Sequence, residues 1–293
     1  MSALFFALAA EAKPWIQALN AKPDREQGHF RFYHTLEREH SIAITGPGKV
    51  AMAMAVTEFA QKIHKSKRKD HFRIWNIGIA GAPNIDYPIG DFFWINKVTD
   101  ISSGRDYYTE RIEKVSNHKE LSISTFDKPV TIISPSPSPF FQSVGRESLH
   151  STSLIDMEAS GFFEAASVYF DLSTIQIGKI VSDHLEGYMC DPNLVQGYIN
   201  RTCIELKDIF LSETVFPKRE ILSMQDWAGF KKVGENLHFT ESMLVELKKS
   251  ILYYKINHPD KQVPVPNLSD EEKPNEKYQS KKIFSDWRNS LYV

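Results

Sequence analysis

The chain of 293 residues carries 35 Lys and Arg against 37 Asp and Glu, so its formal net charge at pH 7 is only −2. This balance gives the chain as a whole no electrostatic attraction for nucleic acid or an anionic membrane, and we expect neither as a partner. Hydrophobic residues make up 42% of the chain, which is compatible with a sizeable core, and the length suits one large α/β domain or two smaller ones.

The two cysteines, Cys190 and Cys203, are too few for a disulfide framework in a chain of this length. We therefore expect reduced thiols and a cytoplasmic protein. No apolar stretch reaches the roughly 18–20 residues of a membrane span. The apolar run 3–10 has no basic residue before it and ends at Glu11, which indicates a buried strand rather than a signal peptide.

The first half of the chain contains several apolar segments and one clear helix. The helix predicted over residues 49–65 has apolar side chains at helical spacing, namely Met52, Val56, Phe59 and Ile63. A basic stretch, HKSKRKD (64–70), follows it; a solvated helix end is the favoured interpretation and a nucleic-acid patch the alternative. A short helix is also predicted over 11–20, and strands over 2–10, 29–36, 41–45, 72–81, 91–101, 120–126 and 130–134.

The second half of the chain begins with a proline-rich break, SPSPSPFF (134–141). Alternate prolines fix φ and remove backbone donors, so this segment cannot be regular. The elements predicted after it are a short strand through Met157, a helix over about 158–169, a strand over 174–183 and a helix over 191–210. Strands that alternate with helices indicate an α/β fold around a mostly parallel or mixed sheet.

The composition changes near residue 213. Two helices are predicted beyond it, over about 218–232 and 240–256, and the second has an apolar face of Leu244, Leu247, Ile251 and Tyr254. Residues 257–282 are rich in Pro, Lys and Glu, so we expect them to be extended or disordered, with the aromatic residues of the last segment docking back. The predicted organisation is an α/β domain over 1–213, a helical extension over 214–256 and a Pro/Lys/Glu-rich tail over 257–293.

Polar residues stand at the ends of several predicted buried strands: Glu11, the turn N-x-G-x-A-G from Asn76 to Gly81, Glu158, and the pair Ser182 and Asp183. Ligands of open α/β sheets bind at the carboxyl ends of the strands, so these groups could line one crevice. Each of them alone also has an ordinary explanation, such as first-turn helix chemistry for a glutamate or a turn for the Ser-Asp pair.

The order of these segments resembles the nucleoside phosphorylase/nucleosidase superfamily, in particular the methylthioadenosine/S-adenosylhomocysteine nucleosidases. The resemblance covers about residues 3–210 and implies a three-layer fold with a central mixed sheet, to which this chain adds a helical C-terminal extension. The similar segments are ALAAE (7–11), ITGPGKVAMAMAVT (44–57), NIGIAGAPNIDYPIGDFFWINKVTD (76–100), DMEASGFFEAA (156–166) and KIVSDH (179–184).

The resemblance implies that a purine leaves a ribosyl carbon through an oxocarbenium-like transition state. Asp183 matches the family's acid, which protonates the leaving base near N7 and needs a raised pKa to do so, and Ser182 would orient it. Glu158 would accept hydrogen bonds from two ribose hydroxyls, with Met157 packed on the sugar. Glu11 matches the residue that binds and activates water. Asp156 is expected to be structural.

The base needs a slot of backbone donors and a ring on which to stack. The glycine turn offers Ala80 and Gly81, and the loop after the prolines offers Phe140 and Phe141. The two phenylalanines could equally be core aromatics. SPSPSPFF (134–141) replaces the family's usual base-binding loop, so we expect an altered pocket.

Water is the expected nucleophile, because phosphorylases of this superfamily have Arg and Ser in R-x-G-S where this chain has Asn76 and Ile79. A phosphorylase remains the alternative, and Arg105 is a cation that could contact phosphate or form a loop salt bridge. A catalytically altered nucleoside-binding module is the other alternative.

No cofactor or metal is expected. His184, Glu186, Cys190 and Asp191 match no standard zinc spacing, and no G-x-G-x-x-G opens a helix after the first strand. The resemblance also implies a homodimer that takes a small-molecule nucleoside.

Overall fold

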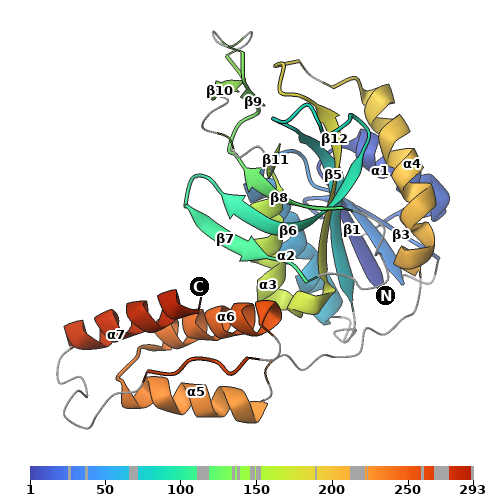
Figure 1. Cartoon of the computed structure of the whole chain (residues 1–293). Helices are drawn as coiled ribbons and strands as arrows, with labels where there is room; N and C mark the ends of the chain where they lie inside the picture. Colours follow the sequence, from blue (N-terminus) through green and yellow to red (C-terminus); the bar gives the residue numbers. More distant parts are fainter. Residues whose placement is uncertain are drawn as a thin grey trace. The chain divides into compact units, whose positions relative to one another are not determined.

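The computed structural model (Figure 1) describes the chain apart from residues 26–27, 37–38, 66–71, 111–118, 134–135, 137–138, 146–148, 150–152, 189, 212–221, 223, 259–260, 267–276 and 292–293. The chain separates into two compact units, residues 1–215 and 216–293. No helix in the described part of the chain has the length and apolar character needed to cross a membrane.

The N-terminal unit is an α/β structure. Its strands are β1 (Ser2–Phe6), β2 (Lys22–Pro23), β3 (Arg31–His34), β4 (His40–Ile44), β5 (Arg73–Gly81), β6 (Phe92–Asp100), β7 (Arg105–Tyr108), β8 (Glu120–Thr125), β9 (Val130–Thr131), β10 (Gln142–Ser143), β11 (Ser153–Asp156) and β12 (Ile175–Asp183). Its helices are α1 (Ala9–Ala18), α2 (Lys49–Lys65), α3 (Ala159–Tyr169) and α4 (Pro192–Leu211), with a 3₁₀ turn at Leu172–Thr174.

Ten of these strands form one mixed sheet in the order β11-β8-β6-β12-β5-β1-β4-β3-β2, with β7 paired to β6. The neighbours β4, β1, β5 and β12 are mutually parallel, so their carboxyl ends lie along one edge. β11 runs antiparallel to β5 and meets it only where Ile155 pairs with Gly81. The end of β11 is therefore brought to the end of β5.

Helices cover both faces of this sheet, which makes three layers. Phe5 of β1 packs on Phe59 of α2 and Phe162 of α3, with ring centroids 5.6 and 5.7 Å apart. Trp75 of β5 packs on Phe210 of α4 at 5.8 Å. Because Trp75 pairs with Leu4, the residue before Phe5, alternation along β1 places the two sets of contacts on opposite faces. The predicted α/β class with a mixed central sheet is confirmed.

Several element boundaries follow the sequence pattern. The helix predicted over 49–65 has these bounds in the structure. The first strand is shorter than predicted, because it ends at Phe6 and Glu11 lies in the first turn of α1 rather than at a strand end. The strands β2, β7 and β10 were not predicted, and Asn76–Gly81, expected as a turn, belongs to β5. The basic stretch 64–70 lies almost entirely outside the described residues.

The C-terminal unit has helices α5 (Met224–Asn236), α6 (Glu241–Asn257) and α7 (Lys277–Ser290). The predicted apolar face of α6 is buried and packs with Phe284, Trp287 and Leu291 from the end of the chain. Trp287 Nε1 donates a hydrogen bond of 2.6 Å to the carbonyl of Pro264. The predicted docking of the last aromatic residues is thus seen, whereas the expectation of an extended or disordered 257–282 is wrong from Lys277 onward, where α7 begins.

Candidate active site

Most of the predicted site residues lie where the carboxyl ends of β1, β5, β11 and β12 meet. Glu11 is 2% exposed and Glu158 is 8% exposed, so both carboxyl groups are buried. Ala80 and Gly81 end β5, and Ser182 and Asp183 end the neighbouring β12, whose residue Asp183 pairs with Gly81. The position agrees with the general location of ligand sites in open α/β sheets.

Glu11 is held across the end of β5 by two backbone donors. Its Oε1 accepts from the N–H of Ile79 at 2.9 Å, and its Oε2 accepts from the N–H of Leu8 at 2.8 Å. Burial raises the pKa of Glu11, although these two hydrogen bonds and Lys179 oppose the rise. A carboxylate that is fixed in place and whose pKa is raised is a stronger base, which suits it to receiving a proton.

Lys179 is a site residue that the sequence did not reveal. Its ammonium lies 2.9 Å from Asp156 Oδ2, and the two side chains are 2% and 1% exposed. Burial opposes the charge on Lys179, but Asp156, Glu158 and Glu11 together keep its pKa above the usual value. The only signal in the sequence was a lysine inside a largely apolar strand, which requires a buried partner.

The Asp156 carboxylate is held by an ion pair and two hydrogen bonds. Besides Lys179, its carboxylate accepts from Thr125 Oγ1 at 2.8 Å and from the N–H of Ala159 at 2.9 Å. Its two oxygens are therefore occupied by three donors. This arrangement agrees with a structural role for Asp156, which anchors Lys179 and the start of α3.

Glu158 directly precedes α3 and faces the start of α2. Its Oε1 accepts from the N–H of Gly48 at 2.9 Å. Gly48 has a φ of +102°, a conformation that a side chain would disfavour, and this conformation directs its N–H at the carboxylate. Burial, followed by the charge of Asp156, raises the pKa of Glu158 to about 7. Among the described residues no hydrogen bond reaches Oε2.

Glu11, Asp156, Glu158 and Lys179 form one buried charge cluster, since each carboxyl perturbs the ammonium. Gly78 of β5 makes room for it. A Cβ at Gly78 would lie 2.9 Å from Glu11 Oε1 and 3.5 Å from Lys179 Nζ. Three carboxyl groups against one ammonium leave the buried charge cluster with an excess of negative charge at alkaline pH.

Asp183 is surrounded by donors. Ser182 Oγ donates to Oδ2 at 2.6 Å, and the N–H of Leu185 donates to Oδ1 at 2.9 Å. Cys190 Sγ lies 3.6 Å from Oδ2, which the sequence did not predict. Burial, followed by the charge of Asp183, raises the pKa of Cys190 to about 11, so its thiol keeps its proton and can donate.

A polar network behind Glu158 joins the starts of α2 and α3. Lys49 Nζ lies 2.8 Å from Asp100 Oδ2 and 2.9 Å from Asp127 Oδ1, and Ser160 Oγ donates to Asp100 Oδ2 at 2.8 Å. Burial opposes the ionisation of Asp100, but these donors hold its pKa well below the usual range. A side chain at Gly161 would collide with the Lys49 carbonyl, so the helices approach closely here.

The remaining predicted residues are less enclosed. Met157 and Phe141 are half-buried, and Phe140 is 78% exposed. Much of the proline-rich segment before them lies outside the described residues. Arg105 forms an ion pair of 2.9 Å with Glu164 on the surface, with side chains 66% and 51% exposed. The loop salt bridge was one of its two predicted roles.

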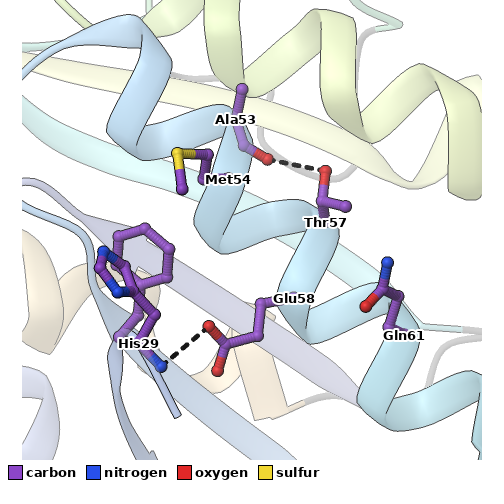
Figure 2. Close-up of a pocket in the computed structure, with 7 residues that line it drawn as sticks. His29, Ala53, Met54, Thr57, Glu58 and Gln61 are labelled. Carbon is purple, nitrogen blue, oxygen red and sulfur yellow. Dashed lines mark hydrogen bonds between the residues drawn. The ribbon is translucent and has the colours of Figure 1, made fainter.

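A separate hollow of about 410 Å³ lies beside α2, lined by His29, Phe30, Ala53, Met54, Thr57, Glu58 and Gln61 (Figure 2). None of these residues was predicted as part of the site. The N–H of His29 donates to Glu58 Oε2 at 3.2 Å, and Thr57 Oγ1 donates to the carbonyl of Ala53 at 2.9 Å.

Over the described residues, no group of three His, Cys, Asp or Glu side chains is arranged to hold a metal ion.

No protein-family model and no curated protein matches the chain. Solved structures do match it. The 5'-methylthioadenosine/S-adenosylhomocysteine nucleosidase of Helicobacter pylori, solved with butyl-thio-DADMe-Immucillin-A, has a TM-score of 0.55 and 16% identity over 71% of this chain and 96% of its own. The futalosine hydrolase of Helicobacter pylori has a TM-score of 0.54 and 16% identity, with coverages of 71% and 96%.

A third structure, the MTA/SAH nucleosidase of Streptococcus pneumoniae in complex with 8-aminoadenine, has a TM-score of 0.52 and 17% identity, covering 72% of this chain and 98% of its own. The matched share of this chain is close to the size of the N-terminal unit. The chain therefore has the nucleoside phosphorylase/nucleosidase fold, as seen in the methylthioadenosine/S-adenosylhomocysteine nucleosidases.

Proposed function

We propose that this protein hydrolyses the N-glycosidic bond of a purine nucleoside or thio-nucleoside, such as methylthioadenosine or S-adenosylhomocysteine, and releases the free base. The observation that carries the proposal is the buried charge cluster at the same strand ends as Asp183, on a fold shared with known nucleosidases. Buried carboxyl groups with raised pKa values at a ligand-binding edge are typical of acid–base sites.

Asp183 is the acid in this proposal. As the bond between the ribosyl carbon and the base breaks, the base takes up negative charge, and a proton from Asp183 near N7 neutralises it. Ser182 and the N–H of Leu185 hold the carboxyl group in one orientation.

Glu158 and Met157 bind the sugar. Glu158 Oε1 is fixed by Gly48, which leaves Oε2 to accept from a ribose hydroxyl. A ribose that satisfies this oxygen would also offset the cost of burying the carboxylate. Met157, half-buried beside it, provides an adaptable apolar wall.

Glu11 receives the proton of the attacking water. The water oxygen forms a bond to the ribosyl carbon that the base leaves, and its proton passes to the Glu11 carboxylate. The charge of Lys179 favours the ionised form of Glu11 and so opposes the rise in its pKa. The two backbone donors keep the carboxyl group at the end of β5.

Water is favoured over phosphate as the nucleophile. A phosphate dianion would enter a buried charge cluster that already holds three carboxyl groups and one ammonium. Arg105, the candidate phosphate ligand, pairs with Glu164 instead. A phosphorylase therefore stays the second candidate.

The base would lie against the backbone of Ala80 and Gly81, with Phe140 or Phe141 as the stacking ring. Phe140 could serve only if its loop approaches the site when a nucleoside binds, because its ring is exposed.

We further propose a cytoplasmic homodimer without a cofactor, in which residues 1–213 are catalytic, 214–256 form the helical extension and 257–293 form the tail. The free thiols Cys190 and Cys203 accord with a reducing compartment.

The test is the release of free base from methylthioadenosine, S-adenosylhomocysteine, adenosine and inosine, followed by chromatography with and without phosphate. Equal release without phosphate supports hydrolysis and identifies the substrate. Release only with phosphate supports the phosphorylase. No release from any nucleoside, together with measurable binding of the same compounds, would favour a nucleoside-binding module.

A further inference from the structure

Leu185 follows the proposed acid by two residues and has an unusual backbone conformation. Its φ is +64°, and among the described non-glycine residues only Asn20 and His238 also have a positive φ. A leucine is strained there, so the surrounding contacts must hold it. They do: its N–H donates to Asp183, and its carbonyl accepts from the N–H of Ile132 at 3.1 Å and from Thr131 Oγ1 at 3.0 Å.

The Leu185 side chain covers the end of β5 at Gly81. It is 4% exposed and packs with Phe126, Val130 and Ile155. A Cβ at Gly81 would overlap Leu185 Cδ2 and would lie 3.3 Å from Asp183 Oδ1. One methyl group of Leu185 therefore fills the space above Gly81, and the Asp183 carboxyl group borders the same space.

A base that takes a proton from Asp183 must lie within hydrogen-bond distance of that carboxyl group. It must therefore lie against the Leu185 side chain or displace it. A leucine side chain has no donor or acceptor, so it can select a leaving group only by size and shape. One methylene of misfit in an apolar pocket changes kcat/KM by about 10- to 200-fold.

We propose that Leu185 is the specificity-determining wall of the leaving-group pocket, and that its side chain above Gly81 limits the size of the base. This inference rests on the proposed function of the same site. The competing explanation is that Leu185 only holds the Asp183 loop in place. Loss of the side chain would then lower turnover of every nucleoside by a similar factor and leave the size preference unchanged.

The first measurement tests the contact without any need for activity. Gly81→Ala should lower Tm by about 4 °C or more in the full-length protein, because the new methyl group meets Leu185. In the Leu185→Gly background the same change should cost less than half as much, since the obstructing side chain is gone. Glycine adopts a φ of +64° without strain, which makes Leu185→Gly the variant best able to keep the loop. An equal fall in Tm in both backgrounds would show that Leu185 does not fill the space above Gly81.

The second measurement tests size selection. Inosine and 1,N6-ethenoadenosine present two and three fused rings, each with an N7 that can take the proton from Asp183, and kcat/KM is measured for both. In Leu185→Gly the kcat/KM for 1,N6-ethenoadenosine divided by the kcat/KM for inosine should rise about tenfold or more above the wild-type ratio. Val130→Ala is the matched control, because Val130 belongs to the same apolar cluster but supplies none of the three atoms nearest to a Cβ placed at Gly81. Its ratio should stay within about twofold of the wild type.

Three other outcomes would overturn the proposal. An unchanged ratio in Leu185→Gly, with the Gly81 coupling intact, would show that Leu185 only packs the loop. An equal rise in Val130→Ala would show general loosening of the pocket. If the wild type releases no base from any nucleoside, the proposed function fails and this inference fails with it. If the Gly81→Ala coupling is nevertheless found, the contact between Leu185 and Gly81 is correct and only the proposed reaction is wrong.

Discussion

At the scale of single residues, Asp183 carries the chemistry of the proposal, so its removal is the sharpest test. Asp183→Asn keeps the shape of the side chain but cannot donate the same proton. We expect kcat to fall by about 10²- to 10⁴-fold while the free energy of unfolding changes by less than about 1 kcal/mol. Asp171→Asn, at an exposed aspartate, is the matched control and should leave both quantities unchanged. A fully active Asp183→Asn would refute the acid assignment.

The raised pKa of Glu158 predicts how the stability of the protein depends on pH. Its pKa is raised from 4.5 to about 7 in the folded protein, so the folded state binds a proton more tightly than the unfolded state does. The contribution of Glu158 to stability is therefore fully present below pH 4.5 and is lost as the pH rises through 7. At 1.36 kcal/mol for each pKa unit, the loss is about 3 kcal/mol.

The measurement is the free energy of unfolding by urea at pH 5 and pH 8. Glu158→Gln cannot ionise, so its stability should fall less between these pH values than that of the wild type. A residual fall is expected because burial also raises the pKa of Glu11. Glu164→Gln, at a side chain that is 51% exposed, should behave like the wild type. The same fall in Glu158→Gln and in the wild type would contradict the assignment.

At the scale of elements, the ion pair between Lys179 and Asp156 connects β12 with β11 across β5. Lys179→Met leaves the buried Asp156 carboxylate without its cation, and we expect a loss of about 3–5 kcal/mol of stability. In the double variant Lys179→Met/Asp156→Asn most of this loss should be recovered, since the uncompensated charge is gone. Urea unfolding at pH 8 measures both, and additive losses in the double variant would show that the two groups do not depend on each other.

At the scale of the whole molecule, each compact unit has its own apolar core. We therefore expect residues 1–213 to fold alone and to keep the base-release activity within about tenfold of the full chain. Circular dichroism and the nucleoside assay check this. A soluble, folded fragment without activity would show that the extension takes part in catalysis.

Light scattering on the full chain should give twice its mass of 33.6 kDa if the proposed homodimer is correct.

Strong periodicity made much of the fold predictable. Met52, Val56 and Phe59 recur at helical spacing and are buried in α2, and the apolar run of β5 is buried along most of its length. The pair Ser182 and Asp183 ends β12 as expected. Asn76–Gly81, expected as a glycine-rich turn, instead forms the second half of β5, and Glu158 lies two residues beyond the end of β11. The helix α7 was missed, because its Lys-rich composition hides two apolar side chains, Phe284 and Trp287, that become buried only in the packed unit.

By itself the sequence determined the α/β class and which acids stand near strand ends, because alternation, helical spacing and turn residues are local properties. Only the tertiary structure decided which partners those acids have. Lys179 meets Asp156, and Leu185 covers Gly81, across separations of 23 and 104 positions in the chain. Such contacts depend on the order of strands in the sheet and on a positive φ at Leu185. Neither follows from local pattern, because long-range packing sets both.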